Sequence, residues 1–289
     1  MTSGQVSGTS TTMHDILTIA HLTLFEARRK RIVAAAMLCG VAFLTVFALG
    51  LYGVFNDLMR KQVTFIERQT TVVLLTVAGL YAVNFLCVLF AVLLPVDAIS
   101  GEIDSGVMQT IASKPIRRSD VLLGKWLGYW VVVATYLAML CAGVLLTGRL
   151  IAGHVQPNAF AAFGLMLLEM TLLMTVSVAG GTRLSTVTNG IAALGFYGVA
   201  FIGGWVEQIG GLTGIASART LGIVVSLISP PDILWRLGAY WLQPPILRDI
   251  GDSPFTATTV PSPLMVWWAA GFTVVMLIVG VRSFKTRQL

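Results

Sequence analysis

Residues Val72–Val96, VVLLTVAGLYAVNFLCVLFAVLLPV, form a run of 25 residues without a charge. A membrane-spanning helix needs about 20 apolar residues, because each residue rises about 1.5 Å and the hydrocarbon core is about 30 Å thick. Hydrocarbon offers the backbone no hydrogen-bond partner, whereas a helix satisfies its backbone groups within the segment. The run therefore predicts a membrane-spanning helix.

The rest of the chain is similarly apolar. Of its 289 residues, 56% are hydrophobic and 11% charged, with a mean hydropathy of +0.85, whereas soluble domains carry roughly 25% charged residues. We expect an all-α polytopic membrane protein with one domain, residues 12–289, after a disordered Ser-, Thr- and Gly-rich leader, residues 1–11, which does not resemble a cleaved signal peptide. Six stretches are long and apolar enough to be spans: Ile32–Val54, Val72–Val96, Trp126–Thr147, Ala159–Thr182, Gly190–Gln208 and Ser262–Val281.

Basic residues near the span ends indicate the orientation. If six spans alternate, twelve of the 19 Lys and Arg residues fall on one side: Arg28, Arg29, Lys30, Arg31, Lys114, Arg117, Arg118, Lys125, Arg183, Arg282, Lys285 and Arg287. Cytoplasmic loops carry such an excess, so we expect both termini in the cytoplasm. The net charge of +6 is then mainly a topological signal. A nucleic-acid partner, which would need basic residues gathered with aromatics on one face, is not expected.

Residues 12–31 predict an amphipathic elbow helix along the cytoplasmic membrane face. Apolar residues recur at helical spacing from Ile16 to Ala27, Thr12 can cap the helix, and Asp15 lies in its first turn. The basic run 28–31 would lie near anionic headgroups. The alternative is a simple extension of the first span with a positive flank.

The connection between the fifth and sixth spans, residues 209–261, is far longer than the few residues usual between packed helices. Leu221–Ile228 is apolar but too short to cross the membrane, and Pro230 follows it. Ile233–Leu242 is amphipathic and carries aromatic residues suited to a membrane–water interface, namely Trp235, Tyr240 and Trp241. We therefore expect a helical hairpin on the outer face, with a re-entrant position of one helix as the alternative.

The polar connection between the second and third spans, residues 97–120, predicts a short coupling helix at the cytoplasmic face. Ser105 can cap a new turn, Gly106 allows a bend, and Pro115 ends the helix. One face of that turn is apolar, with Val107, Met108, Ile111 and Ala112. An exposed apolar stripe usually marks a partner site. The alternative is a solvated basic loop that serves only to set the topology.

This segment resembles the signature of the permease subunits of type-2 ATP-binding-cassette exporters. It reads Glu102-x-x-x-Gly106-Val-Met-Gln-Thr-Ile-Ala-Ser-Lys-Pro115-Ile-Arg117-Arg-Ser-Asp-x-Leu-Leu-Gly124-Lys125. Val107 and Met108 stand where the family often shows Thr and Leu, which keeps the apolar contact but removes one hydroxyl. The elbow helix and outer hairpin resemble the family as well. The outer loop and the Gly-Gly-x-x-Glu-Gln stretch 203–208 are most similar to the sub-branch containing the permease of nitrous-oxide-reductase maturation.

The resemblance implies the partners. Two cytoplasmic ATPase subunits, which bind ATP and magnesium, would dock on a pair of permeases, expected to be a homodimer, in a prokaryotic plasma membrane. Glu102 and Asp104 would form salt bridges to the ATPase, and Val107, Met108 and Ile111 would fill its groove. The complete set of implied contact residues is Glu102, Asp104, Ser105, Gly106, Val107, Met108, Ile111, Pro115 and Arg117.

The chain itself is not expected to be an enzyme or to bind a cofactor. The phosphate-binding motif Gly-x-x-x-x-Gly-Lys-Ser/Thr is absent, and Gly124-Lys125 lacks both the earlier glycine and the following hydroxyl. We expect Lys125 to reach lipid phosphates instead. Gly-x-Ser-x-Gly and His-Glu-x-x-His are also missing, as are Cys-x-x-Cys pairs.

Two polar residues inside predicted spans are candidates for the translocation path. Glu169 lies near the middle of the fourth span, where a charge costs at least roughly 3 kcal/mol, and Asn84 lies in the second. Glu169 could line the path or exchange a proton, or it could be a protonated acid hydrogen-bonded to a neighbour. Asn84 is expected to bridge helices. Glu207, at the outer end of the fifth span, is expected to pair with a loop arginine such as Arg219.

Met166, Met170 and Met174 recur every four residues, so their thioethers share one helix face. Thioethers suit cuprous ions, although methionine is also an ordinary filler of irregular packing. These are the candidate metal ligands in the chain.

The sequence thus predicts the membrane subunit of an ATP-driven transporter, with export as the expected direction. One alternative is a non-transport scaffold of the same family that transmits force to an outer partner. The other is a lipid-modifying enzyme of the bilayer, which the lack of paired catalytic groups disfavours.

Overall fold

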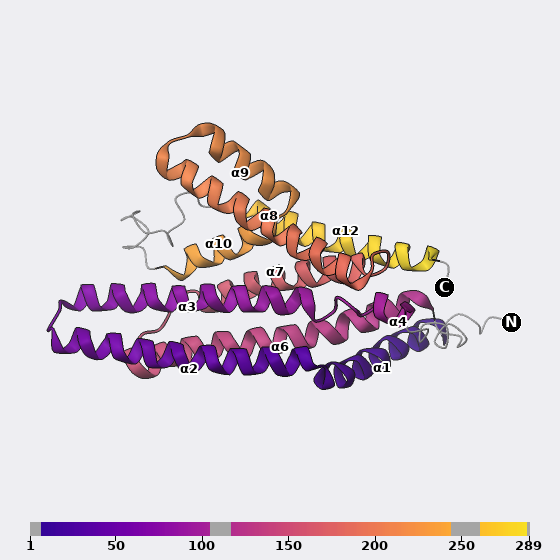
Figure 1. The fold of residues 1–289 in the computed structure, drawn as a ribbon, viewed down its shortest axis with the longest axis horizontal. Coiled ribbons are helices and arrows are strands. Elements are labelled where there is room, and N and C mark those ends of the chain that lie inside the picture. The colour runs from indigo at the N-terminus through magenta and orange to yellow at the C-terminus, as the bar shows by residue number, and fades with distance from the viewer. Residues whose placement is uncertain (1–6, 105–116, 244–260, 288–289) are drawn as a thin grey trace.

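The structure, a computed structural model, describes residues 7–104, 117–243 and 261–287, with side chains described from residue 13 and not for 103–104. Within these ranges it is entirely helical apart from turns and short connections (Figure 1). The helices are α1 (Ser7–Arg29), α2 (Arg31–Arg60), α3 (Phe65–Leu93), α4 (Ser100–Asp104), α6 (Arg118–Ala152), α7 (Ala159–Gly180), α8 (Thr186–Thr213), α9 (Ala216–Ile228), α10 (Pro231–Leu242) and α12 (Leu264–Thr286).

Six of these helices are long and apolar enough to span a membrane: α2, α3, α6, α7, α8 and α12. They confirm the six predicted spans and the all-α fold class. The chain enters and leaves at the same end of the bundle, here called the terminal end, where α1 begins and α12 ends (Figure 1). The opposite end, called the loop end, holds the turn 61–64 that joins α2 to α3.

α7 lies at the centre of the fold. It packs against α3, α6, α8, α10 and α12, and its side chains from Leu172 to Ser177 are almost all fully buried. α2 lies at the periphery and buries few residues, among them Gly40 and Leu51. An apolar helix with so much exposed surface requires lipid or another protein around it.

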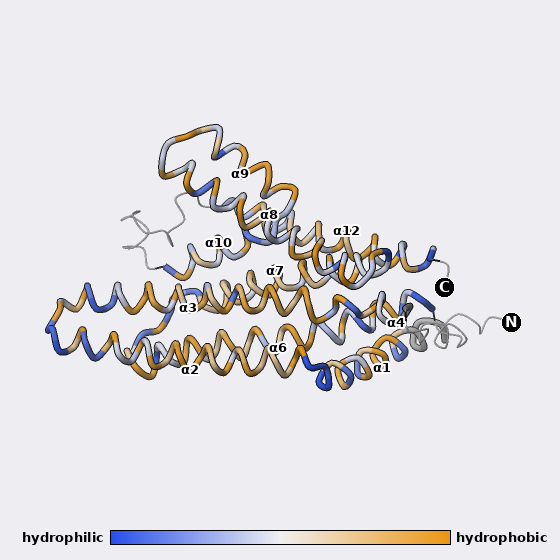
Figure 2. The backbone as a smooth tube through the Cα atoms, viewed as in Figure 1, coloured by the Kyte–Doolittle hydropathy of each residue, from blue (hydrophilic) through white to orange (hydrophobic). Residues whose placement is uncertain are grey.

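Five of the six spans extend beyond the apolar runs that predict them at one end or both, whereas α7 ends at Gly180, two residues before the end of its run. α6 contains 35 residues, or about 52 Å at 1.5 Å per residue, which exceeds the hydrocarbon thickness of about 30 Å. Figure 2 shows apolar colouring along the middle of the long helices and polar colouring at the α1–α2 junction and the α2–α3 turn. The polar first turns of α6, which include Asp120 and Lys125, therefore belong to the terminal end rather than to the apolar part of the span.

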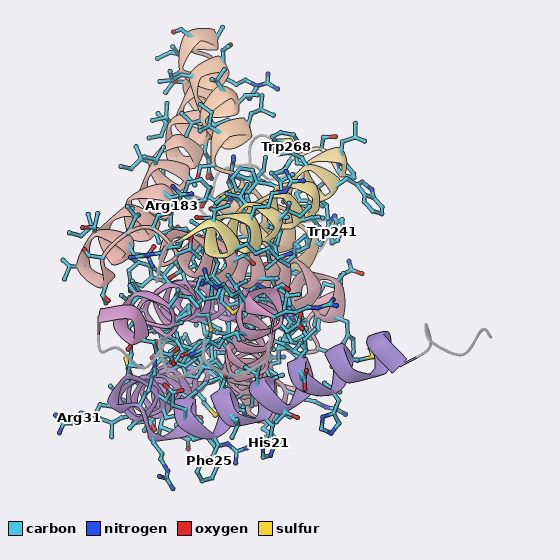
Figure 3. The ribbon with its side chains drawn as sticks, turned by 90° about the vertical axis from the view of Figure 1, so that its right-hand side faces the viewer. His21, Phe25, Arg31, Arg183, Trp241 and Trp268 are labelled. Carbon is cyan, nitrogen blue, oxygen red and sulfur yellow. The ribbon has the colours of Figure 1, made fainter. Side chains whose placement is uncertain are left out.

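α1 is a helix separate from α2. It begins at Ser7, five residues before the expected start, and Lys30 interrupts the helix with an extended backbone (φ −68°, ψ 133°). α1 packs on α6, and Figure 3 shows His21 and Phe25 pointing away from the bundle. The interruption of the helix at Lys30 argues against a simple extension of the first span. The placement of α1 on a membrane surface stays a prediction.

The connection between the fifth and sixth spans contains two helices, as expected. α9 packs along α8, and α10 turns back at an angle of 111° to α9 and packs against α7 (Figure 1). The expected position at a membrane–water interface is wrong for Trp235. Trp235 is 3% exposed and packs edge-on against Tyr81, with ring centroids 5.3 Å apart. α10 thus lies inside the protein after a sharp bend from α9.

Candidate functional site

The candidate site is the connection at the terminal end between α3 and α6. Six of the expected ATPase contacts, Ser105, Gly106, Val107, Met108, Ile111 and Pro115, lie outside the described residues, as does the side chain of Asp104. Glu102, on α4, and Arg117, which directly precedes α6 and is exposed, are described. The geometry of the site therefore comes from the two places where the connection joins the bundle.

Lys125 holds α4 against α6. Its ammonium group forms an ion pair with Glu102 and donates a second hydrogen bond to the Ala98 carbonyl at 3.3 Å. Lys125 is 4% exposed, so the expectation that it reaches lipid phosphates is wrong. Glu102, expected to face the ATPase, contacts its own chain here. The two residues are 23 positions apart, and the fold brings them together because α6 returns past the end of α3.

Close packing requires a glycine at position 124, directly before Lys125. An added Cβ at Gly124 would lie 2.7 Å from the Ile19 Cβ of α1, and one at Gly128 would lie equally close to Thr23 Cβ. Real Cβ atoms do not approach so closely, so both positions require glycine for α1 to pack on α6. The Gly-Lys pair thus joins two elements to α6, α1 through the glycine and α4 through the lysine.

Lys30 forms a second ion pair at this end. Its ammonium nitrogen lies 2.6 Å from an Asp97 carboxylate oxygen and donates to the Tyr129 hydroxyl at 3.2 Å. Burial alone would lower the pKa of Lys30, but Tyr129 and Asp97 outweigh it and raise that pKa above its ordinary value. The contacts join the α1–α2 junction to the residues between α3 and α4 and to α6.

Hydrogen bonds attach the end of α3 to α7 and α8. The Asn189 amide donates to the Ser177 carbonyl at 2.8 Å and to the Val96 carbonyl at 3.2 Å. The hydroxyls of Ser100 and Thr186 lie 2.8 Å apart. Backbone carbonyls freed where α3 ends are thus satisfied by side chains of other spans. A displacement of the connection would act directly on α3, α6 and α8.

The fold brings Asn84 and Glu169 together. The Asn84 amide nitrogen donates to one Glu169 carboxyl oxygen at 3.3 Å, and the residues are 2% and 0% exposed. In the described part of the chain, Asn84 Oδ1 and Glu169 Oε2 have no hydrogen-bond partner. A proton on Oε2 could be donated to Oδ1 if the amide turned toward it. The expected helix bridge by Asn84 is present, and both residues face the protein core in this conformation.

A buried charge cluster joins α8, α9 and α10. The Arg236 guanidinium lies 3.0 Å from Glu207 and 3.0 Å from Asp232, and it donates to the Ser226 hydroxyl at 3.2 Å. The expected pairing of Glu207 with Arg219 is therefore wrong. The four-residue spacing of Asp232 and Arg236 was the available sequence signal. An added Cβ at Gly204 would overlap the Asp232 carboxylate.

The methionine stripe lies in the main core. Met166, Met170 and Met174 are each 1% exposed or less, and the Cys141 thiol lies 3.9 Å from the Met166 sulfur. Among the described residues, no group of three or more His, Cys, Asp or Glu side chains could hold a metal ion. Apolar packing accounts for the positions of the three thioethers, and their role as metal ligands stays a prediction.

Comparisons with known proteins agree with this geometry. Residues 17–289 match the family model described as ABC-2 family transporter protein. The chain is 30% identical over 188 residues to the probable ABC transporter permease protein NosY of Stutzerimonas stutzeri, covering 61% of each chain. It is 34% identical over 121 residues to the protein of the same name from Pseudomonas aeruginosa, covering 41% of this chain and 40% of that protein. These matches span less than two thirds of either relative. Because the family model matches nearly the whole chain, residues 17–289, the chain belongs to the ABC-2 family of transporter proteins.

Proposed function

We propose that this chain is the permease subunit of an ATP-driven exporter. Two copies would span a prokaryotic plasma membrane with their termini in the cytoplasm, and two ATPase subunits carrying ATP and magnesium would dock on the connection between α3 and α6. This assignment is favoured over the lipid-modifying enzyme because the polar groups described above are engaged in helix-to-helix contacts rather than gathered around a reaction centre.

The observation that carries the proposal is the double attachment of α4, which begins this connection. On one side, Glu102 of α4 is paired with Lys125 of α6. On the other, Ser100 contacts Thr186 at the start of α8. A rigidly attached segment transmits a push to the spans, whereas a freely solvated loop would absorb it. The arrangement therefore suits a lever better than a loop that only sets the topology.

The lever would change how α3, α6 and α8 pack. ATP-driven closure of the ATPases would displace residues 105–116, and the ion pair would carry that displacement into α6. Packed interfaces tend to switch between discrete arrangements rather than deform continuously. Such a switch would alternate inward and outward openings between the two permeases.

The exposed apolar surfaces are consistent with a paired subunit. α8 presents Val199 and Ile202, which are 52% and 64% exposed, and Gly195 and Gly198 of the same helix have open space at their Cβ positions among the described residues. Small residues on a spanning helix allow a second helix to approach closely. A second copy is the partner that this proposal places there.

Co-purification tests the docking site. Ile111→Asp places a charge on the expected apolar contact, and we expect it to reduce recovery of the ATPase subunit at least tenfold while membrane insertion stays normal. Ile66→Asp is the matched control, because Ile66 is 69% exposed in the first turn of α3 at the loop end. Undiminished recovery with Ile111→Asp would refute the docking site.

A distance measurement tests the coupling. Spin labels at Ile66 and Leu212, both exposed, would report movement of α8 relative to α3 in a background with Cys39→Ser. We expect ATP to shift the distance in the assembled complex, and Lys125→Met to abolish the shift while the ATPase still co-purifies. An ATP response that survives Lys125→Met would show that the ion pair does not carry the displacement.

A further inference from the structure

An apolar cavity of about 560 Å³ lies near the loop end, between α6 and α7. Leu80 of α3 and Leu242 at the end of α10 also line it. Its volume falls within the roughly 300–1,000 Å³ typical of ligand sites. The contacts of the docking site lie at the opposite end of α6, so this cavity is a separate feature of the molecule.

The walls are apolar and the mouth faces outward. Ala138, Leu145, Phe163 and Met166 contribute to the wall. At the rim, Leu146 is 54% exposed and Phe160 is 94% exposed. Both belong to spanning helices, so the rim would contact hydrocarbon in a membrane. A water-soluble polar ligand would find no hydrogen-bonding wall there, whereas an acyl chain can enter without losing contact with an apolar environment.

One end of the cavity is polar and cationic. Arg149, in the last turn of α6, lines it together with His154 and Gln156. In the described parts of the chain, no carboxylate lies within ion-pair distance of Arg149. Gln156 is fixed in place, because it donates to the Leu242 carbonyl at 2.7 Å and its amide oxygen lies 2.9 Å from a His154 ring nitrogen.

From this juxtaposition we propose that the cavity binds an anionic phospholipid, with one acyl chain between α6 and α7 and the phosphate at Arg149. A guanidinium can bind phosphate oxygens through two parallel hydrogen bonds. Each methylene removed from water contributes about 0.8 kcal/mol, but lipid in the bilayer is already in hydrocarbon. The charge must therefore provide the preference for this lipid over its neighbours.

Native mass spectrometry of the purified full chain tests the site. Phosphatidylglycerol and phosphatidylcholine with the same acyl chains would be titrated separately. We expect one phosphatidylglycerol to bind at least fivefold more tightly than phosphatidylcholine, whose choline cation offsets its phosphate charge. Fivefold corresponds to the contribution of about 1 kcal/mol expected for one basic residue near an anionic lipid. Equal affinities for the two lipids would overturn the headgroup assignment and with it the proposal.

Two variants locate the binding. Arg149→Gln should abolish the preference for phosphatidylglycerol, whereas the matched control Arg60→Gln, another exposed arginine at the loop end that does not line the cavity, should keep it. Ala142→Phe should fill the cavity and weaken the binding of both lipids at least fivefold. Ala142 is exposed, so the variant should fold, and Arg149→Gln decides the question if it does not.

Other outcomes contradict the proposal. An unchanged preference in Arg149→Gln would place the lipid elsewhere. A lipid-free dimer that Ala142→Phe dissociates would show that a second copy of the chain occupies the cavity. Loss of the preference in Arg60→Gln as well would indicate a general surface charge effect instead of a site.

Discussion

Ionic contacts at the terminal end and in the α8–α10 region differ in their burial and in the sequence separation of the residues that they join. At the terminal end, the ion pair of Lys30 and Asp97 is partly exposed, with side chains that are 19% and 47% exposed. In the α8–α10 region, Arg236, Asp232 and Glu207 have side chains that are 7–9% exposed. The first pair joins residues 67 positions apart, whereas the second cluster lies within 30 positions.

This difference suggests that the two regions have different tasks. A buried charge left without its partner costs about 3–5 kcal/mol, while an exposed ion pair contributes about 0–1 kcal/mol. The α8–α10 cluster can therefore hold the buried helix α10 in one arrangement. The Lys30–Asp97 pair can break and re-form at low cost, which suits a region proposed to move. Substitutions at these contacts test the contrast.

Arg236→Met should destabilise the protein most. It leaves Glu207 and Asp232 buried beside each other without their cation, and we expect a loss of about 3–5 kcal/mol in the free energy of unfolding. An SDS titration followed by circular dichroism would measure it. Arg219→Met replaces an exposed arginine of α9 outside the cluster and should change stability by less than about 0.5 kcal/mol. Equal effects of the two variants would remove the contrast between the regions.

Lys125→Met should have an intermediate effect. Its ion pair with Glu102 joins a buried lysine, with a side chain 5% exposed, to a glutamate that is 21% exposed, so water can partly solvate the remaining carboxylate. We expect a loss of about 1.5–3 kcal/mol, the range for hydrogen bonds to charged groups. The same titration would measure it, and a loss as large as that of Arg236→Met would show that the terminal end is equally rigid.

Glu169→Gln and Glu169→Leu distinguish a protonated Glu169 from an ionised one. Glutamine can exchange two hydrogen bonds with the Asn84 amide, so we expect less than about 1 kcal/mol of change. Leucine leaves the buried amide without a partner, which costs about 1–3 kcal/mol. Thermal unfolding in detergent would rank the variants. A glutamine variant less stable than the leucine variant would exclude a protonated Glu169 paired with Asn84.

Lys30→Met should have the smallest effect, about 0–1 kcal/mol, because Asp97 is half-exposed. The pKa of Lys30 is raised on folding, so its contribution is fully present below the unfolded-state pKa of about 10.4 and is lost as the pH rises through the folded-state pKa. Stability measured from pH 7 to 11 should therefore show the wild type and the variant converging at the alkaline end. Convergence already at pH 8 would contradict the assigned pairing.

The sequence by itself determined the six spans and the two-helix connection before the last of them. Most of the run, Val72–Leu93, had to become helical, because any bilayer-embedded segment must satisfy its own backbone hydrogen bonds, and that requirement depends on local composition alone. The pairing of Asn84 with another span was also predictable, because a polar side chain in hydrocarbon needs a partner. The identity of that partner, Glu169, was not predictable.

The tertiary structure alone decided which side chains meet. Lys125 appeared suited to lipid phosphates and Glu207 to Arg219, yet Lys125 turns inward to Glu102 and Glu207 pairs with Arg236. The aromatics of α10 suggested an interface, yet Trp235 is buried against Tyr81. A partner depends on which helices pack together and how they are rotated, and those are set by close packing of the whole bundle, including positions such as Gly124 and Gly204 where only glycine fits.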